Sequence, residues 1–379
     1  MTDTATLDAP APLTEVWYTR CPVPTASGLA YHLGWLTEAL GAHGLVVGIL
    51  QDGPRELRPH HLDHRLPGLV REGGNVPALA ARSEGAPTRL IGLTWIDEWQ
   101  KILVRGDSGI TSPEQLQGLR LALPAWAPTR AASFPRAMSL HGYQQALSLG
   151  GLTLSDVSFV EVPTLSAADR VLDRRSDLSI FGLDHLATGE VDAVYVKGAA
   201  SAEEARAIGA TVAVDLDALD DRRLRVNNGT PRPLTVHQQL LDEHPEVVVA
   251  FLVETLRAAD WAAGHPDDVR RILEAETRSG PGGVAEAYRD GFHTSLHPDL
   301  SDERLELLDA QKQFLFLHGF LAADVDVHAW ADPEPLRRAR EILGAEGGVG
   351  GRTQPGAGGA AGAGGAAGVE GEIEGEEAR

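Results

Sequence analysis

The sequence predicts an α/β protein made of two lobes. Its 379 residues are enough for two domains. Short strands alternate with helices, which is typical of a largely parallel sheet covered by helices. Two such sets follow one another, before and after about residue 112, and a helical segment comes after them. We therefore expect a ligand cleft between two lobes, where small-molecule sites commonly lie.

The expected division of the chain follows from this order. The first lobe should comprise residues 14–112 together with 216–340, and the second lobe residues 113–215. The remaining segment, 345–379, is low-complexity sequence of Gly, Ala and Glu. Such a composition cannot bury a core, so this tail is expected to be disordered.

The first set begins with a strand at "TEVWYTRC", residues 14–21, which is rich in β-branched and aromatic side chains. A helix capped by Thr25 or Ser27 follows, and Gly41 ends it. Its apolar face consists of leucines at helical spacing, namely Leu29, Leu33, Leu36 and Leu40. The later elements are a strand at 45–50, a helix at 76–84, and strands at 88–96 and 100–105.

The second set contains a short helix and a strand within 112–126, a helix at 133–152, and strands within 157–163, 186–197 and 209–216. From about residue 236 the pattern is helical almost throughout. Pro245 begins one helix, whose apolar side consists of Val248, Leu252, Leu256 and Ala259. Further helices are expected near 267–276, 283–291 and 302–320.

Charge and composition exclude several classes of partner. The formal charge of −21 argues against binding nucleic acid or an anionic membrane surface. There is no run of 18 apolar residues, no secretory signal pattern and only one cysteine, which permits no internal disulfide. We expect a cytoplasmic monomer, for which an anionic small molecule stays possible as a ligand if an arginine or a helix N-terminus in a cleft holds it.

The single cysteine, Cys21 in "YTRCPVP", lies where a strand passes into a helix. Ligands bind at the carboxyl ends of such strands, and a helix N-terminus stabilises a thiolate. Position alone leaves three interpretations open: a lipid-anchor site, an inert buried side chain, or a nucleophile. A lipid anchor would need an apolar stretch before the cysteine, which "VWYTRC" does not supply.

Two further stretches could bind an anion. "RPHHLDHRLPGLVREGGNVPAL", residues 58–79, combines three histidines, arginines and a Gly-Gly pair before a predicted helix. It can be a solvated loop, a zinc site through His61 and His64, or a site where a histidine, an arginine and backbone N–H groups act on an oxyanion. "PTRAASFPRAM" places Arg130, Ser133 and Arg136 at the start of a helix, either as an anion site or as an ordinary capped helix.

The segments "SPEQLQGLRLALP" and "LATGEVDAVYVKG" resemble substrate-binding proteins for sulfonates, nitrate and thiamine precursors. That resemblance implies the two-lobed type 2 periplasmic-binding-protein-like fold. "YTRCPVP" and "HLDHRLPGLVREGGNVPAL" are more similar to the 2'-hydroxybiphenyl-2-sulfinate desulfinase family, which has the same fold. This family acts last in the removal of sulfur from dibenzothiophene and takes sulfite off an aryl sulfinate without a cofactor.

The desulfinase resemblance implies roles for particular residues. Cys21 matches the essential cysteine of the family, His61 its catalytic histidine and Arg71 its sulfinate-binding arginine. Gly74, with Gly73 before it, matches the backbone N–H donor. His60 is the alternative to His61 if the loop is shifted by one residue.

The chain departs from the family at two positions expected to contact substrate. Leu62 stands where the family has an aromatic residue, and Leu66 where it has a glutamine. The substrate skeleton is therefore left open.

The resemblance implies a cysteine-dependent desulfinase that acts on an anionic small molecule, a sulfinate, and uses neither a cofactor nor a bound metal. Cys21 could protonate the ring carbon, or its thiolate could attack sulfur, with His61 stabilising the thiolate in either case. Two alternatives remain. One is a non-catalytic ligand-binding protein of the transporter type, and the other is a related decarboxylase or desulfonating enzyme.

Overall fold

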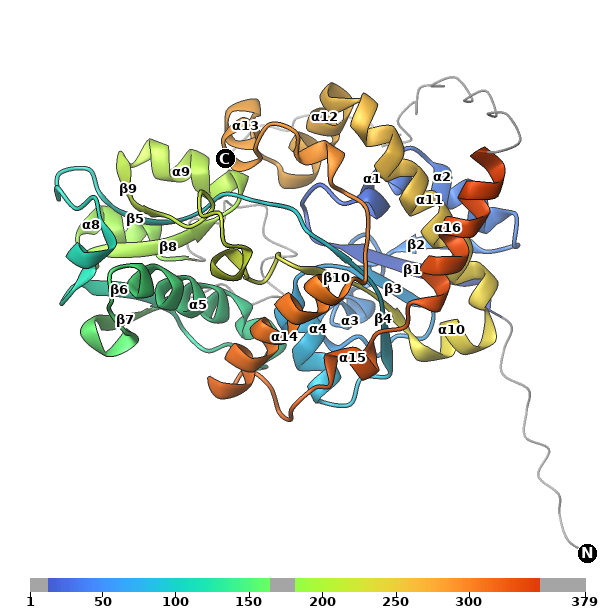
Figure 1. Ribbon diagram of the computed structural model, residues 1–379, viewed down its shortest axis with the longest axis horizontal. Helices are drawn as coiled ribbons and strands as arrows, with labels where there is room; N and C mark the ends of the chain where they lie inside the picture. Colours follow the sequence, from blue (N-terminus) through green and yellow to red (C-terminus); the bar gives the residue numbers. More distant parts are fainter. Residues whose placement is uncertain (1–12, 164–180, 348–379) are drawn as a thin grey trace, which may run out of the picture.

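The computed structural model describes residues 13–163 and 181–347, which form two five-stranded sheets with helices packed around them (Figure 1). The first sheet occupies the right half of Figure 1 and the second sheet the left half. The α/β class and the two-lobed arrangement predicted from the sequence are confirmed. Of the predicted tail, 345–379, residues 345–347 belong to the last helix, and 348–379 lie outside the described residues.

The first sheet has the strand order β2-β1-β3-β10-β4. Its strands are β1 (Glu15–Arg20), β2 (Val46–Ile49), β3 (Leu69–Glu72), β4 (Thr88–Thr94) and β10 (Arg232–His237). β1 pairs in parallel with β2 and β3, whereas β10 is antiparallel to both β3 and β4. The sheet is therefore mixed, and β10 joins it from a distant part of the sequence.

The second sheet has the order β7-β6-β8-β5-β9. Its strands are β5 (Gln100–Arg105), β6 (Arg120–Pro124), β7 (Ser158–Val162), β8 (Ala193–Lys197) and β9 (Ala210–Asp215). β5 is antiparallel to β8 and β9, so this sheet is mixed as well. The expectation of largely parallel sheets is confirmed, because four of the five strands in each sheet run in the same direction. The one opposing strand is β10 in the first sheet and β5 in the second, and each comes from chain that crosses between the two sheets. The expected division at residue 112 stays a prediction, although the pairing of β5 favours a crossover before Gln100.

The helices follow most of the predicted segments. Those of the first half are α1 (Ala26–His32), α2 (Trp35–Gly41), α3 (His60–Asp63), α4 (Asn75–Ser83) and α5 (Phe134–Leu149). Those of the second half are α8 (Leu183–Thr188), α9 (Ala199–Ala207), α10 (Gln238–Glu243), α11 (Pro245–Gly264), α12 (Pro266–Thr277), α13 (Pro281–Ala287), α14 (Asp302–Leu317), α15 (Val327–Trp330) and α16 (Glu334–Gly347). No helix of the described ranges is long and apolar enough to cross a membrane.

The helix expected to end at Gly41 is in fact two. Thr25 caps α1, with its hydroxyl accepting the Gly28 N–H, as one of the two predicted alternatives. The chain then breaks at Gly34, whose φ of 80° is open to glycine but strained for other residues. The leucine periodicity continues across this break, which is why the sequence suggested a single helix.

Two hydrophobic clusters pack against the first sheet, and the larger of them extends over the second sheet as well. One joins β1 to α1 and α11, with Tyr18 lying tilted against Phe251. The other joins α4 and β4 to α14 and α15 around the fully buried Trp330, whose indole N–H donates to Thr88. Both clusters include chain that follows β10, so helices from the end of the sequence pack against the first sheet. The predicted assignment of residues 216–340 to the first lobe stays a prediction.

In the second sheet the Tyr143 hydroxyl connects two strands. It donates to the Ala122 carbonyl at 2.6 Å and accepts the Tyr195 N–H at 2.9 Å, and the Tyr143 side chain is fully buried. A Tyr143→Phe substitution should lower the free energy of unfolding by about 1–3 kcal/mol, because it leaves two buried backbone groups unpaired.

Chemical denaturation of the two proteins would measure this loss. Tyr31→Phe is a matched control, because no hydrogen bond involves that hydroxyl within the described residues and the ring is only partly buried. An equal, small effect of both substitutions would contradict the assigned role of Tyr143.

Candidate active site

The sequence candidates meet at one edge of the first sheet. Cys21 follows the carboxyl end of β1, and Gly73 and Gly74 follow the carboxyl end of β3. These two strands are parallel, with Arg20 paired to Glu72, so their ends coincide. The carboxyl ends of parallel strands are where ligands bind in α/β sheets. The structure thus brings together residues separated by about fifty positions in the sequence.

The Cys21 thiol is half-buried and faces the Gly-Gly turn. The Gly74 N–H donates to Cys21 Sγ at 3.3 Å, and the Cys21 N–H donates to the Glu72 carbonyl at 3.1 Å. Within the described residues, Sγ makes no hydrogen bond other than the one it accepts from the Gly74 N–H. The Gly74 N–H thus fixes the position of the sulfur beside the Gly-Gly turn.

Arg71, on β3, is the largest charged group of the site and is only 1 % exposed. Its Nε donates to the His61 carbonyl at 3.0 Å and its Nη1 to the Gly74 carbonyl at 3.2 Å. Its Nη2 is buried and has no hydrogen-bond partner within the described residues. Two edges of the guanidinium are thus fixed by backbone, and the third is available for an acceptor that the protein itself does not provide.

Burial lowers the pKa of Arg71 to about 10. The coulombic interaction with Cys21 opposes this shift, and the charge of Arg232 adds to it. Arg71 therefore stays a cation at neutral pH. Burial of an unpaired cation is costly unless an anion compensates it. The site is thus prepared for a negatively charged ligand.

His61, and not His60, contacts Arg71. The His61 carbonyl accepts from Arg71, and its Nδ1 is 2.8 Å from the Thr19 hydroxyl. His60 instead turns to the Asp63 carboxylate at 2.7 Å. Burial, with the charge of Arg71 added, lowers the pKa of His61 to about 3, so its imidazole is neutral at physiological pH.

The two glycines are required by close packing. A Cβ on Gly73 would lie 2.7 Å from the Arg71 guanidinium, and one on Gly74 would lie 2.4 Å from the side-chain amide of Asn228. Neither gap can hold a larger residue without displacing a group of the site. Asn75, the next residue, donates its amide N–H to the carbonyls of Asn227 and Pro231. The Gly-Gly turn is therefore fixed to the segment that leads into β10.

Of the two predicted substrate contacts, Leu62 lies in α3 and Leu66 on the segment between α3 and β3. Leu62 packs against the hydrophobic cluster of α4, α14 and α15. The Leu66 carbonyl accepts the Leu69 N–H at 3.2 Å. A role for either leucine in substrate binding stays a prediction.

The other candidate stretch, around Arg130 and Arg136, forms structural contacts. Arg130 pairs with Glu84 at 3.2 Å, and Arg136 pairs with Glu161 at 3.0 Å. The Ser133 hydroxyl donates to the Thr129 carbonyl within its own turn. For zinc, no group of three or more His, Cys, Asp or Glu side chains within 13–163 and 181–347 is arranged to hold a metal ion.

Sequence reasoning missed Thr19, Asn228 and Arg232. Each reaches the site through the pairing of β1, β3 and β10, and β10 was not recognised as a strand because two prolines interrupt its sequence, "TPRPLTVH". No local motif marks these residues, so only the fold reveals them.

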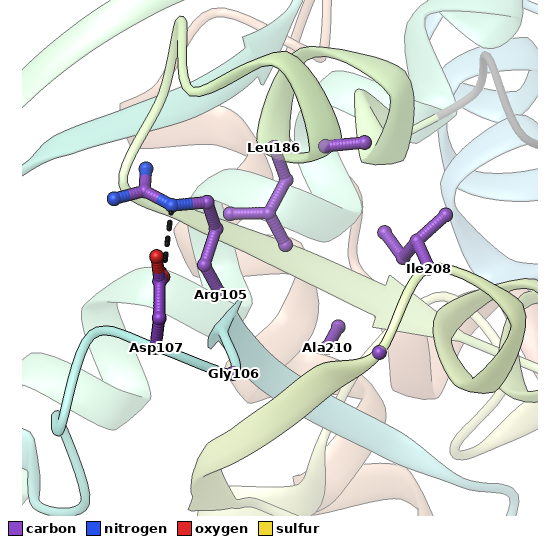
Figure 2. A pocket seen from close by; sticks show the side chains of 8 residues that line it. Arg105, Gly106, Asp107, Leu186, Ile208 and Ala210 are labelled. Carbon is purple, nitrogen blue, oxygen red and sulfur yellow. Dashed lines mark hydrogen bonds and ion pairs between the residues drawn. The ribbon is translucent and has the colours of Figure 1, made fainter.

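Figure 2 shows a hollow of about 470 Å³ in the second lobe. Its lining includes Arg105, Asp107, Leu186 and Ile208, and Arg105 is paired with Asp107 at 3.2 Å. Cys21 and Arg71 are not part of this lining. With its arginine already neutralised and no nucleophile in its wall, this hollow offers less chemistry than the edge of the first sheet.

Over most of its length the chain is similar to known proteins. Residues 70–269 match the family model described as NMT1/THI5 like. The 2'-hydroxybiphenyl-2-sulfinate desulfinase of Rhodococcus erythropolis is 30 % identical over 355 residues, which cover 85 % of this chain and 92 % of that protein. The corresponding protein of Rhodococcus qingshengii gives the same values.

Among solved structures, a cysteine-to-serine mutant of DszB in complex with biphenyl-2-sulfinic acid superposes with a TM-score of 0.72. It is 26 % identical, and the match covers 87 % of this chain and 100 % of that one. The periplasmic aliphatic sulphonate binding protein SsuA from Escherichia coli matches at a TM-score of 0.61 and 13 % identity, over 85 % of this chain and 92 % of that one. At that identity the likeness to SsuA is one of fold alone.

The neutral His61 gives a testable dependence of stability on pH. Its pKa is about 3 in the folded protein and near 6.5 when unfolded, so below about pH 6.5 the unfolded chain binds a proton that the folded chain does not. The free energy of unfolding should therefore fall as the pH decreases, by up to about 1.4 kcal/mol per pH unit for this group.

Denaturation of wild type and His61→Gln between about pH 6 and 4.5 measures this contribution. The variant should show a shallower loss of stability. Equal slopes in the two proteins would show that the folded state already accommodates a protonated His61.

Proposed function

This chain belongs to the 2'-hydroxybiphenyl-2-sulfinate desulfinase family, and from that premise we propose that it cleaves the carbon–sulfur bond of an organic sulfinate and releases sulfite. The observation that carries the proposal is the meeting of three groups at one sheet edge. These are the Cys21 thiol, the Gly74 N–H directed at it, and the unpartnered Nη2 of Arg71.

Arg71 is the residue proposed to hold the sulfinate. A guanidinium matches the two oxygens of such an anion, and its charge does not depend on pH in the working range. The carbonyls of His61 and Gly74 orient the group before substrate arrives, so little side-chain entropy is lost on binding. The Gly74 N–H is placed to hydrogen-bond either the sulfur of Cys21 or an oxygen of the bound anion.

Two routes from this arrangement balance to the same net reaction, in which a sulfinate and water give an arene and bisulfite. In the first, the carbon–sulfur bond breaks and the ring carbon takes the Cys21 proton. Sulfur dioxide then leaves and is hydrated, and water returns a proton to the thiolate. In the second, the Cys21 thiolate attacks sulfur, the ring carbon leaves and takes a proton from water, and a second water hydrolyses the sulfur–sulfur bond.

The role of His61 in this proposal differs from that expected from the sequence. A histidine with a pKa of about 3 carries no positive charge near neutral pH, so it cannot stabilise the Cys21 thiolate as an imidazolium. The positive charge acting on Cys21 is that of Arg71. His61 is instead proposed to fix Arg71 through its carbonyl and to act as a neutral hydrogen-bonding group. Both routes add water and use only side chains of this chain, so the proposed enzyme is a hydrolase without a cofactor.

Sulfite release from a panel of aryl and alkyl sulfinates tests the proposal. Wild type should release sulfite, and Cys21→Ser should lose at least about a hundredfold in kcat, because the proton donor or nucleophile is removed. Sulfinate binding without turnover, equal in both proteins, would identify a ligand-binding protein instead.

The assignment of Arg71 is tested by Arg71→Lys in the same assay. Lysine keeps the charge but lacks the planar guanidinium whose separate nitrogens reach the two carbonyls and the anion, so kcat/KM should fall by about a hundredfold. Arg65→Lys is the matched control, because Arg65 is exposed on the segment before β3 and donates to the Glu84 carbonyl. Equal activities of the two variants would show that Arg71 does not bind the substrate.

A further inference from the structure

A second buried arginine, Arg232, lies at the same sheet edge as Cys21 and Gly74. Arg232 is the first residue of β10, and the next residue, Pro233, accepts the Gly73 N–H at 3.1 Å through its carbonyl. Leu234 pairs with Glu72. Because side chains alternate along a strand, Arg232 and Leu234 share the sheet face of Glu72, and Arg71 projects from the other face.

Arg232 has no acceptor of its own. The residue is 3 % exposed, its Nε is buried without a hydrogen-bond partner, and within 13–163 and 181–347 no hydrogen bond or ion pair involves its guanidinium. Two other buried cations of this region, Lys197 and Arg225, each lie beside a carboxylate. Lys197 lies 3.1 Å from Glu98, and Arg225 lies 2.8 Å from Asp97.

Glu72, the carboxyl on the same sheet face, does not supply the acceptor that Arg232 lacks. Its two carboxyl oxygens accept the hydroxyls of Ser27 and Thr94, and burial raises its pKa, with those hydrogen bonds and the charge of Arg232 opposing the shift. Burial thus disfavours the charged form of the Glu72 carboxyl, and each of its two oxygens already accepts a hydroxyl. A buried guanidinium without an acceptor lowers the stability of the fold unless a ligand supplies that acceptor.

The end of Arg232 is directed toward the second lobe. A Cβ on Gly229 would lie 2.8 Å from Arg232 Nη2 and 3.4 Å from Cε of Lys197, which ends β8 of the second sheet. The guanidinium therefore lies beside the turn before β10, facing a residue of the other sheet. A ligand held by Arg71 at the sheet edge can reach Arg232 only with a second part of its skeleton.

We propose that Arg232 binds a second acidic group of the substrate, so that the substrate class is an aryl sulfinate carrying a further anion such as a carboxylate. This inference rests on the proposed desulfinase function. Arg71 and Arg232 are two cations at one edge of a chain whose net charge is −21, and a single sulfinate neutralises only one of them. Two anionic groups on one substrate would neutralise both, in an interior where such pairs are strong because water is largely excluded.

The experiment compares benzenesulfinate with its 2-, 3- and 4-carboxy derivatives as substrates for wild type and Arg232→Gln. In wild type at least one carboxy derivative should have the higher kcat/KM, and Arg232→Gln should lower the ratio of that derivative to benzenesulfinate by about 10- to 100-fold. Arg225→Gln is the matched control: it removes a buried arginine paired with Asp97 and should leave the ratio as in wild type.

The outcomes separate this inference from the proposed function. An equal loss on all substrates in Arg232→Gln, or no preference for any carboxy derivative in wild type, would overturn the role of Arg232 while leaving desulfination intact. If wild type released no sulfite from any substrate, the proposed function would fail. Calorimetric binding of the same four compounds to Cys21→Ser, with and without Arg232→Gln, would then decide the inference, since a selective loss of affinity for the carboxy derivatives supports it and a uniform change contradicts it.

Discussion

The site depends on one buried cation, Arg71, held by backbone carbonyls rather than by a carboxylate. The carbonyls of His61 and Gly74 accept two of its edges, and Gly73 leaves the room that the guanidinium occupies. Its charge is therefore oriented but not neutralised. A carboxylate in place of the carbonyls would satisfy the arginine and remove its attraction for an anionic ligand.

This constraint explains the neighbouring groups. Burial, together with the positive charge of Arg71, keeps His61 neutral, so the histidine acts through its hydrogen bonds rather than its charge. The same charge acts on Cys21, whose sulfur is held by the Gly74 N–H. An acidic chain thus places its uncompensated positive charge where sulfur chemistry is proposed, and little of that charge is exposed to solvent.

The sequence predicted those parts of the fold that local pattern determines. The strand before Cys21, the cap at Thr25 and the helix from Pro245 follow from propensity and periodicity, and resemblance to a known family identified Cys21, His61 and Arg71. It could not predict β10, because the prolines of this strand suggest a turn, whereas here Pro233 supplies only its carbonyl to the pairing. Without β10, nothing in the sequence placed Arg232 beside a glycine pair more than 150 residues away. The break at Gly34 was hidden because the leucine spacing continues across it.

The central claim is that one anion is held jointly by Arg71 and the Gly74 N–H next to Cys21. The most direct measurement is a crystal structure of the Cys21→Ser variant with a bound aryl sulfinate. The account predicts sulfinate oxygens within hydrogen-bond distance of Arg71 Nη2 and of the Gly74 nitrogen, with the sulfur facing residue 21. A sulfinate bound in the hollow of Figure 2, or at the first sheet edge without contact to Arg71, would contradict it.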